Sequence, residues 1–143
     1  MALQTTVEQA EGRVPVTIVT LVGELDGSSY EGVIETVRGV YEAGGRHLLL
    51  DLTGLAFIAS SGLVALHSSL RLMRGEAPPD PEHGWAAIRE MGDEADSGAT
   101  QTIVQLCGVQ DGVRKVLDRT GLGAVFPSHP DRATAIAAFF ALS

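Results

Sequence analysis

The chain has 143 residues, is 45% hydrophobic, and carries a formal net charge of −8 from ten basic and eighteen acidic side chains. This length and apolar content fit one folded domain and exclude an intrinsically disordered protein. The acidic balance argues against unaided binding to nucleic acid or to an anionic membrane surface, so we expect a protein partner instead.

Cysteine content and hydropathy limit the class of protein further. Cys107 is the only cysteine, so neither an intrachain disulfide nor a thiolate metal cluster can form, and its apolar setting predicts a buried thiol. The first residues lack the basic and apolar regions of a signal peptide. No apolar run approaches the roughly 20 residues needed to span a bilayer. We therefore expect a cytoplasmic protein without membrane insertion.

The first half of the chain predicts strands and a helix in alternation. Residues 3–10 form a candidate edge strand, and residues 14–22 a clearer strand buried on both sides, which Gly23 ends. Ser28 or Ser29 is expected to cap a helix that stops at Gly44 and Gly45. The apolar side chains that define the strand and helix are Val14, Val16, Ile18, Val19, Leu21, Val22, Val33, Ile34, Val37, Val40 and Tyr41.

Residues 47–74 read as a buried strand, a serine-bearing turn and a helix. Four leucines between Leu48 and Leu52 predict an interior strand, and the chain is then expected to turn through residues 55–58. Ser60 or Ser61 is the expected N-cap of the helix. Leu63, Leu66, Leu70 and Met73 would face the sheet, while His67, Ser68, Arg71 and Arg74 would face elsewhere.

After residue 102 the same alternation resumes. Residues 103–107 predict another interior strand, followed by a helix capped by Asp111 and ended by Gly121 with Leu122 in contact. Residues 124–126 would form a brief strand closed by Pro127, and Pro130 would begin a last helix docked by Ile136, Ala137 and Phe140. Alternating strands and helices of this length predict an α/β fold.

The serine pair has two interpretations. As an N-cap, a serine oxygen accepts a hydrogen bond from a backbone N–H of the first turn, which contributes about 1 kcal/mol and requires no function. Alternatively, the hydroxyl is exposed where the positive end of the helix would stabilise an added phosphate. Both interpretations can hold for one residue.

Three segments carry a family resemblance. DLTGLAFIASSGLVAL is similar to the signature of the STAS domains of anti-sigma factor antagonists, and VTIVTLVGELDGSSYEGV and CGVQDGVRKVLDRTGLGAVFP resemble flanking segments in the same order. The resemblance implies an α/β STAS-like fold: a mixed, mostly parallel sheet of four or five strands packed with four helices. We expect a single domain over residues 1–143, with one acidic insertion at residues 75–102.

The resemblance also implies a function. A family member binds an anti-sigma factor that is also a serine kinase, and phosphorylation of the second hydroxyl residue before the glycine, here Ser61, switches it off. The implied partner-binding residues are Asp26, Ser60, Ser61 and Gly62. Asp26 matches the family's G-E-L-D element, but it also fits a turn residue before a helix. No cofactor is implied.

One departure from the signature opens an alternative function. The family usually has Asp two residues before the phosphoacceptor, and this chain has Ala59. This departure favours a second function, in which the chain is a STAS subunit of a lipid-transport ATPase or a stress-signalling complex and docks without being phosphorylated. The oligomeric state is not indicated.

A serine hydrolase is disfavoured, so we expect no enzyme. The G-x-S-x-G elbow is absent, and His67 lies on a different helix face from Ser61. The four histidines, His47, His67, His83 and His129, show no metal-ligand spacing and are expected at the surface or at interfaces.

The insertion differs in composition from the rest of the chain. Residues 76–101 carry seven acids and one base, or −6 of the net −8. They are expected to form a tolerated surface loop far from Ser61. The alternative is an added acidic contact site anchored by Trp85.

Overall fold

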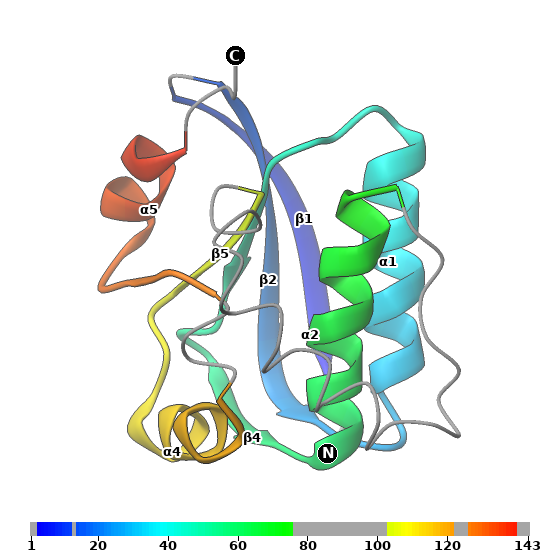
Figure 1. Ribbon diagram of the computed structural model, residues 1–143, viewed down its shortest axis with the longest axis vertical. Coiled ribbons are helices and arrows are strands. Elements are labelled where there is room, and N and C mark those ends of the chain that lie inside the picture. Colours follow the sequence, from blue (N-terminus) through cyan, green and yellow to red (C-terminus); the bar gives the residue numbers. More distant parts are fainter. Residues whose placement is uncertain (1–2, 13, 76–102, 122–125, 140–143) are drawn as a thin grey trace.

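The computed structural model describes residues 3–12, 14–75, 103–121 and 126–139 (Figure 1). The predicted acidic insertion, from residue 76 onwards, lies outside these ranges, and so do His83, Trp85, Leu122 and Phe140. Within the described ranges, no helix combines the length and apolar character that a membrane crossing requires.

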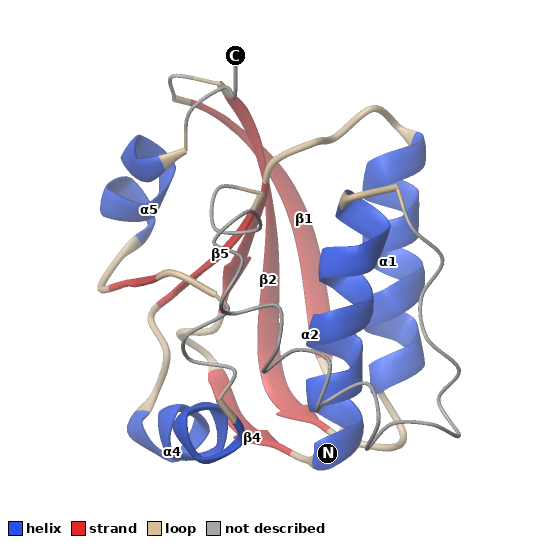
Figure 2. Cartoon of the chain, in the orientation of Figure 1, coloured by secondary structure: helices blue, strands red, loops and turns tan. Residues whose placement is uncertain are grey.

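Five strands of the sheet follow one another in the order β1-β2-β3-β5-β6, and β4 pairs with the end of β2 (Figures 1 and 2). β1, the edge strand predicted at residues 3–10, is antiparallel to β2, and the remaining pairs are parallel. The strands are β1 (Gln4–Glu11), β2 (Pro15–Leu25), β3 (Leu48–Asp51), β4 (Leu55–Ile58), β5 (Val104–Cys107) and β6 (Ser128–His129). The predicted mixed, mostly parallel sheet is confirmed.

Four described helices pack on this sheet: α1 (Tyr30–Glu42), α2 (Ser60–Met73), α4 (Asp111–Thr120) and α5 (Arg132–Ala138). α1 and α2 lie side by side on one face of the sheet (Figure 1). Together with α4, they bury the larger hydrophobic cluster against Val19, Leu21 and Leu50. α5 covers the other face, where Ala135 and Phe139 pack with Ile18 and Leu49.

β2 follows the predicted alternation but is longer than predicted. Gly23 was expected to end the strand, yet β2 continues to Leu25 through an irregularity in register between Gly23 and Glu24, where Gly23 has a φ of 117°. A glycine allows this left-handed backbone, so the strand bulges rather than stops. Val22, predicted to be buried, is 42% exposed next to the bulge.

In the last third of the chain, the strands and helices follow one another in the predicted order, but they begin and end at other residues than predicted. The N-cap of α4 is Gln110 rather than Asp111, while Gly121 has the predicted left-handed conformation. Residues 124 and 125 lie outside the described ranges; the described strand there is β6, which follows Pro127. α5 starts at Arg132, since Asp131 caps it by accepting a hydrogen bond from the Thr134 N–H at 2.8 Å. Ala135 and Phe139 dock α5, and the predicted Ile136 packs against the same cluster, whereas the predicted Ala137 is exposed.

Arg132 ties α5 to three strands. Its Nε donates to Asp51 Oδ2 at 2.6 Å, one terminal nitrogen donates to Thr20 Oγ1 at 2.7 Å, and the other lies 3.3 Å from a Glu8 carboxylate oxygen. Burial alone would raise the pKa of Asp51, but hydrogen bonds from Thr53 and Arg132 outweigh it and hold that pKa below its ordinary value. The ion pair therefore fixes α5 across the second face of the sheet.

Cys107 is buried beside this ion pair, as the apolar run predicted. Burial, together with the negative charge of Asp51, raises the pKa of its thiol to about 12. The thiol is therefore protonated at neutral pH.

Candidate functional site

The two serines lie where β2 and β4 end together. Ile58, the last residue of β4, pairs with Leu25, the last residue of β2. The next backbone N–H, that of Ala59, donates to Leu25 O at 2.9 Å, and α2 begins at Ser60. Residues 55–58 were predicted as a turn but form a strand, β4. Because β4 ends beside the carboxyl end of β2, α2 begins there, and binding sites of α/β proteins usually lie at this end of the strands.

Gly62 allows α2 to press against this strand end. A Cβ atom at this position would lie 2.6 Å from Ile58 Cγ1 and 2.9 Å from both Cγ and the carbonyl oxygen of Leu25. Real Cβ atoms do not approach neighbours so closely, so any larger side chain would push α2 away from β2. Gly62 itself is buried and offers no side chain to a partner. Its role in the site is to fix the distance between the serines and β2.

Neither serine caps α2. The N-cap is Ala59, with extended backbone angles of −93° and 174°, and no side chain makes a cap hydrogen bond there. The prediction that Ser60 or Ser61 is the N-cap is therefore wrong. Both serines already belong to the first helical turn, from which a hydroxyl cannot reach the N–H groups that a cap satisfies. Ser60 is exposed and Ser61 half-buried, so both hydroxyls remain available for other contacts.

Asp26 lies in the turn that faces Ser61. An ideal Cβ built on the next residue, Gly27, would stand 3.9 Å from Ser61 Oγ. The Asp26 carboxylate accepts hydrogen bonds from the Ser28 hydroxyl at 2.6 Å and the Ser28 N–H at 2.9 Å. These two bonds hold the pKa of Asp26 below its ordinary value, so the carboxylate is charged at neutral pH. The structure thus shows Asp26 as a turn residue and brings a fixed negative charge to the same end of the sheet as Ser61.

The Ser29 hydroxyl also stabilises this turn and makes no cap hydrogen bond to α1. Ser29 occupies the N-cap position without a side-chain cap hydrogen bond. Instead, its Oγ accepts from the Asp26 N–H at 3.0 Å and donates to the Glu24 carbonyl at 3.0 Å. Ser29, one of the two predicted residues, is therefore the N-cap of α1, but no serine hydroxyl makes a cap hydrogen bond, because the hydroxyls of Ser28 and Ser29 serve the Asp26 turn.

Phe57 is the residue of this region that the sequence interpretation missed. It is 49% exposed on β4, whereas Leu55 and Ile58 at the two ends of that strand are buried. Phenylalanine is more often buried than exposed, and aromatic residues are enriched at protein interfaces. With residues 55–58 read as a turn, no periodicity indicated its exposure. Phe57 therefore presents an exposed apolar side chain three residues before Ser60.

The histidines do not build a catalytic or metal site in the described residues. His67 is completely buried, against the expectation of a surface position, because α2 is buried around most of its circumference from Gly62 to Leu70; Ser68, predicted to face away from the sheet, is buried as well. His47 packs edge-on against Phe139, and His129 contacts Gln105. Within the described ranges, no group of three His, Cys, Asp or Glu side chains could hold a metal ion.

This chain matches one protein-family model and several solved structures. Residues 8–76 match the model of the STAS domain family, a segment that runs from β1 through α2 and includes Asp26 and both serines. Comparison with curated proteins gives no match.

Three solved structures share the fold over nearly their whole length. An anti-sigma factor antagonist from Mycobacterium paratuberculosis has a TM-score of 0.68 and 21% identity, with 96% of this chain and 93% of that chain covered. The phosphorylated form of the Bacillus cell fate determinant SpoIIAA has a TM-score of 0.56 and 17% identity, with coverages of 92% and 96%. A variant of RsbS from Moorella thermoacetica has a TM-score of 0.53 and 13% identity, with coverages of 92% and 91%. These matches confirm the predicted STAS-like fold.

Proposed function

We propose that this chain, whose residues 8–76 match the STAS domain family model, is an anti-sigma factor antagonist, a regulator that acts by binding and not by catalysis. Its partner in this proposal is an anti-sigma factor with serine kinase activity, and phosphorylation of Ser61 releases that partner. The proposal treats residues 1–143 as one STAS domain. Structures of anti-sigma factor antagonists with the same fold support it.

The position of Ser61 is the observation that carries this proposal. Its hydroxyl is half-buried in the first turn of α2, has no capping role, and faces the Asp26 turn at the shared end of β2 and β4. A serine in this position can be reached by a kinase and can lie inside an interface formed by Asp26, Ser60 and Phe57. The buried Gly62 holds this arrangement rigid, so a partner meets a preformed surface.

Phosphorylation at this position would act through charge. A phosphoserine adds about −1.5 to −2 charge at neutral pH. The positive end of α2 favours the added phosphate in the free protein. In the complex, however, the phosphate would lie between the charged Asp26 turn and the partner, where desolvation and like-charge repulsion disfavour binding. Release therefore requires no refolding of the domain.

Ser61→Asp and Ser61→Ala test the proposal together. Calorimetric titration with the anti-sigma factor encoded nearest to this gene should show weaker binding for Ser61→Asp and unchanged binding for Ser61→Ala. The matched control is Thr134→Asp, which adds the same charge at an exposed position of α5, on the other face of the sheet, and should leave binding unchanged. Equal affinities for all three variants would contradict the placement of the interface at Ser61. Incubation with ATP and the partner, followed by peptide mass mapping, should find phosphate on Ser61 and not on Ser60.

Ala59 supports a second function, a STAS subunit that docks without being phosphorylated, in a lipid-transport ATPase or a stress-signalling complex. Ala59 occupies the N-cap of α2 and offers only a methyl group where the family signature has a carboxylate that could orient the hydroxyl or a kinase-bound metal. Ala59→Asp separates the two functions. If the wild-type chain remains unmodified and Ala59→Asp becomes phosphorylated on Ser61, the phosphorylation switch is ruled out and the docking function is favoured. If both are phosphorylated, the antagonist function stands.

A further inference from the structure

We propose that two copies of this chain pair along β1, so that their two sheets join into one continuous sheet. β1 has 8 residues and lies at one edge of the sheet (Figure 1). Among the described residues it pairs with β2 alone, and every residue of β1 except Ala10 is exposed. The open side of an edge strand presents backbone N–H and C=O groups that can bind a further strand.

The hydrogen bonds of β2 show which β1 residues present these groups. In an antiparallel pair, residues alternate between those that bond to the partner strand and those that point away from it. Thr17 lies opposite Gln9, but its N–H donates to the His47 carbonyl at 2.9 Å, away from β1. Pro15, opposite Glu11, has no N–H to donate. The residues whose backbone groups face the open edge are therefore Thr5, Val7, Gln9 and Glu11.

β1 is complementary to itself in one antiparallel register. With a two-fold axis at Val7, each Val7 exchanges hydrogen bonds with its copy, and Thr5 does so with Gln9 of the second copy. This register overlaps the whole length of β1. An axis at Glu8 would place two Glu8 carboxylates directly opposite each other, which is destabilising. In the Val7 register, Glu8 lies opposite Thr6 instead.

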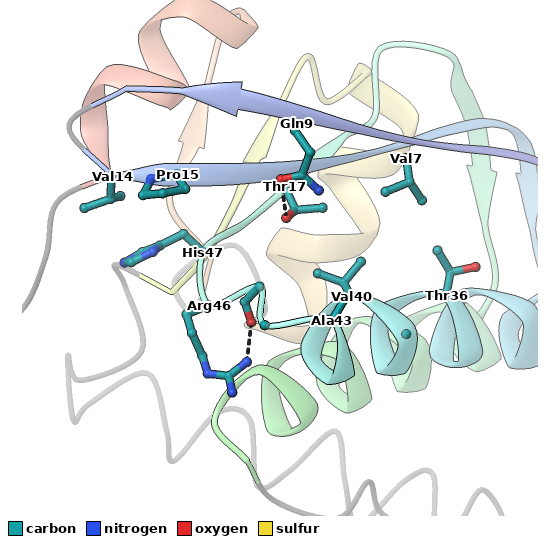
Figure 3. Close-up of a pocket in the computed structure, with 13 residues that line it drawn as sticks. Val7, Gln9, Val14, Pro15, Thr17, Thr36, Val40, Ala43, Arg46 and His47 are labelled. Atoms are coloured by element: carbon teal, nitrogen blue, oxygen red, sulfur yellow. Dashed lines mark hydrogen bonds between the residues drawn. The ribbon is translucent and has the colours of Figure 1, made fainter.

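The side chains of β1 fit the same register. Figure 3 shows Val7 and Gln9 pointing from β1 towards α1. Val7 is 47% exposed, although valine is among the residues most often buried in proteins. In the proposed pair, the two Val7 side chains stand next to each other on this face, with their Cα atoms about 5.5 Å apart. The contact therefore removes from water the most exposed apolar residue of β1.

The acidic residues of β1 do not oppose this pairing. The two Glu8 side chains would be diagonal neighbours, about 7–8 Å apart, but each lies beside Arg132 of its own copy, with a nitrogen–oxygen distance of 3.3 Å. Glu11 would lie opposite Leu3, which carries no charge. A second copy is the occupant that we propose because one register satisfies the free backbone groups of both molecules and places no acid directly opposite another.

Pairing along β1 leaves the Ser61 surface open. Because the two β1 strands run antiparallel, the carboxyl ends of the two β2 strands point to opposite ends of the joined sheet. Ser61 lies at the carboxyl end of β2, so the two Ser61 surfaces face apart and each copy can bind its own partner. One strand from each copy makes an interface at the low end of the size range, below about 1,200 Å². We therefore expect the dimer to dissociate on dilution.

Sedimentation equilibrium and hydrogen exchange test the pairing in the full chain. From about 50 μM to about 1 mM, the wild type should convert reversibly from monomer to dimer. Over the same range, the amides of Thr5, Val7 and Gln9 should exchange more slowly, in proportion to the loss of monomer. The amides of Thr6 and Glu8, which already bond to β2, should not change. A chain that stays monomeric, or dimerises without slowing these three amides, would overturn the proposal.

Val7→Lys tests the position of the axis, because it places two ammonium groups next to each other in the dimer. It should weaken dimerisation at least tenfold. Val22→Lys is the matched control: Val22 is similarly exposed, at 42%, and receives the same charge, but it lies in β2, which has a strand on each side. It should dimerise like the wild type. If both variants are folded and dimerise equally, β1 is not the interface; if Val7→Lys does not fold, the exchange rates of the wild type decide.

Discussion

Gly62→Ala tests the close packing of α2 against the end of β2. An added methyl group would lie 2.6 Å from Ile58 Cγ1 and 2.9 Å from the Leu25 carbonyl oxygen. Because carbon atoms pack best about 3.5–4.0 Å apart, the neighbours must move by about 1 Å. Overpacking of this kind costs about 1–3 kcal/mol, and the greater helix preference of alanine returns at most about 1 kcal/mol. We expect a net loss of about 1–2 kcal/mol in the free energy of unfolding.

The same substitution at Gly39 provides the control, since no atom lies within 4 Å of a Cβ built there. Gly39→Ala should raise the free energy of unfolding by about 0.5–1 kcal/mol, through helix preference alone. Urea unfolding at neutral pH, followed by circular dichroism, measures both variants. Opposite signs are expected. If Gly62→Ala were as stable as Gly39→Ala, the contact between α2 and β2 would be looser than described, and so would the position of Ser61.

Three further predictions follow from individual side chains. Asp51→Asn should lower the free energy of unfolding at pH 7 by about 1.5–3 kcal/mol, because it removes a charged partner of Arg132. The depressed pKa of Asp51 means that its contribution is complete above its unfolded pKa near 4 and is lost as the pH falls through the lower folded value. Urea unfolding below about pH 4 should therefore show the wild type losing stability more steeply than the variant, and parallel pH curves would contradict this. Cys107 should react with a thiol reagent at pH 8 only after unfolding in urea, because its pKa is raised to about 12, and rapid labelling of the folded chain would contradict its burial. Asp131→Ala should cost about 1 kcal/mol through loss of the cap on α5, whereas Ser61→Ala should cost only a few tenths, and equal losses would contradict the cap assignments.

Apolar periodicity was sufficient to predict the interior strands and most helices of this fold. β3 and β5 are short runs buried on both faces, and such runs have few other interpretations in an alternating α/β chain. β4 was missed because its four residues show no alternation: its two ends are buried, and Ala56 and Phe57 between them are exposed. In addition, β4 pairs with the part of β2 that follows the bulge at Gly23. The prediction had ended β2 at this glycine, so no partner strand was expected there.

The residue at which each helix begins was harder to predict than the presence of the helix. A hydroxyl residue near a helix start indicates that a cap is close but does not identify it, and Ala59, Ser29 and Gln110 occupy N-cap positions without a side-chain bond. The burial of His67 depends on what packs around α2, which periodicity cannot describe. The candidate site residues came from the family resemblance. The structure then added the contact that makes Gly62 necessary and the exposed ring of Phe57.

The contacts of Arg132 bear on how the chain folds during its synthesis. Its partners Asp51, Thr20 and Glu8 precede it by 81, 112 and 124 residues. At a translation rate of roughly 5–20 residues per second, Asp51 leaves the ribosome about 4–16 s before the arginine that neutralises it. Until then, closing the second face of the sheet would bury a carboxylate without its counterion, which is unfavourable. Early strands can therefore pair on the nascent chain, but the second face of the sheet can close only after α5 has been synthesised.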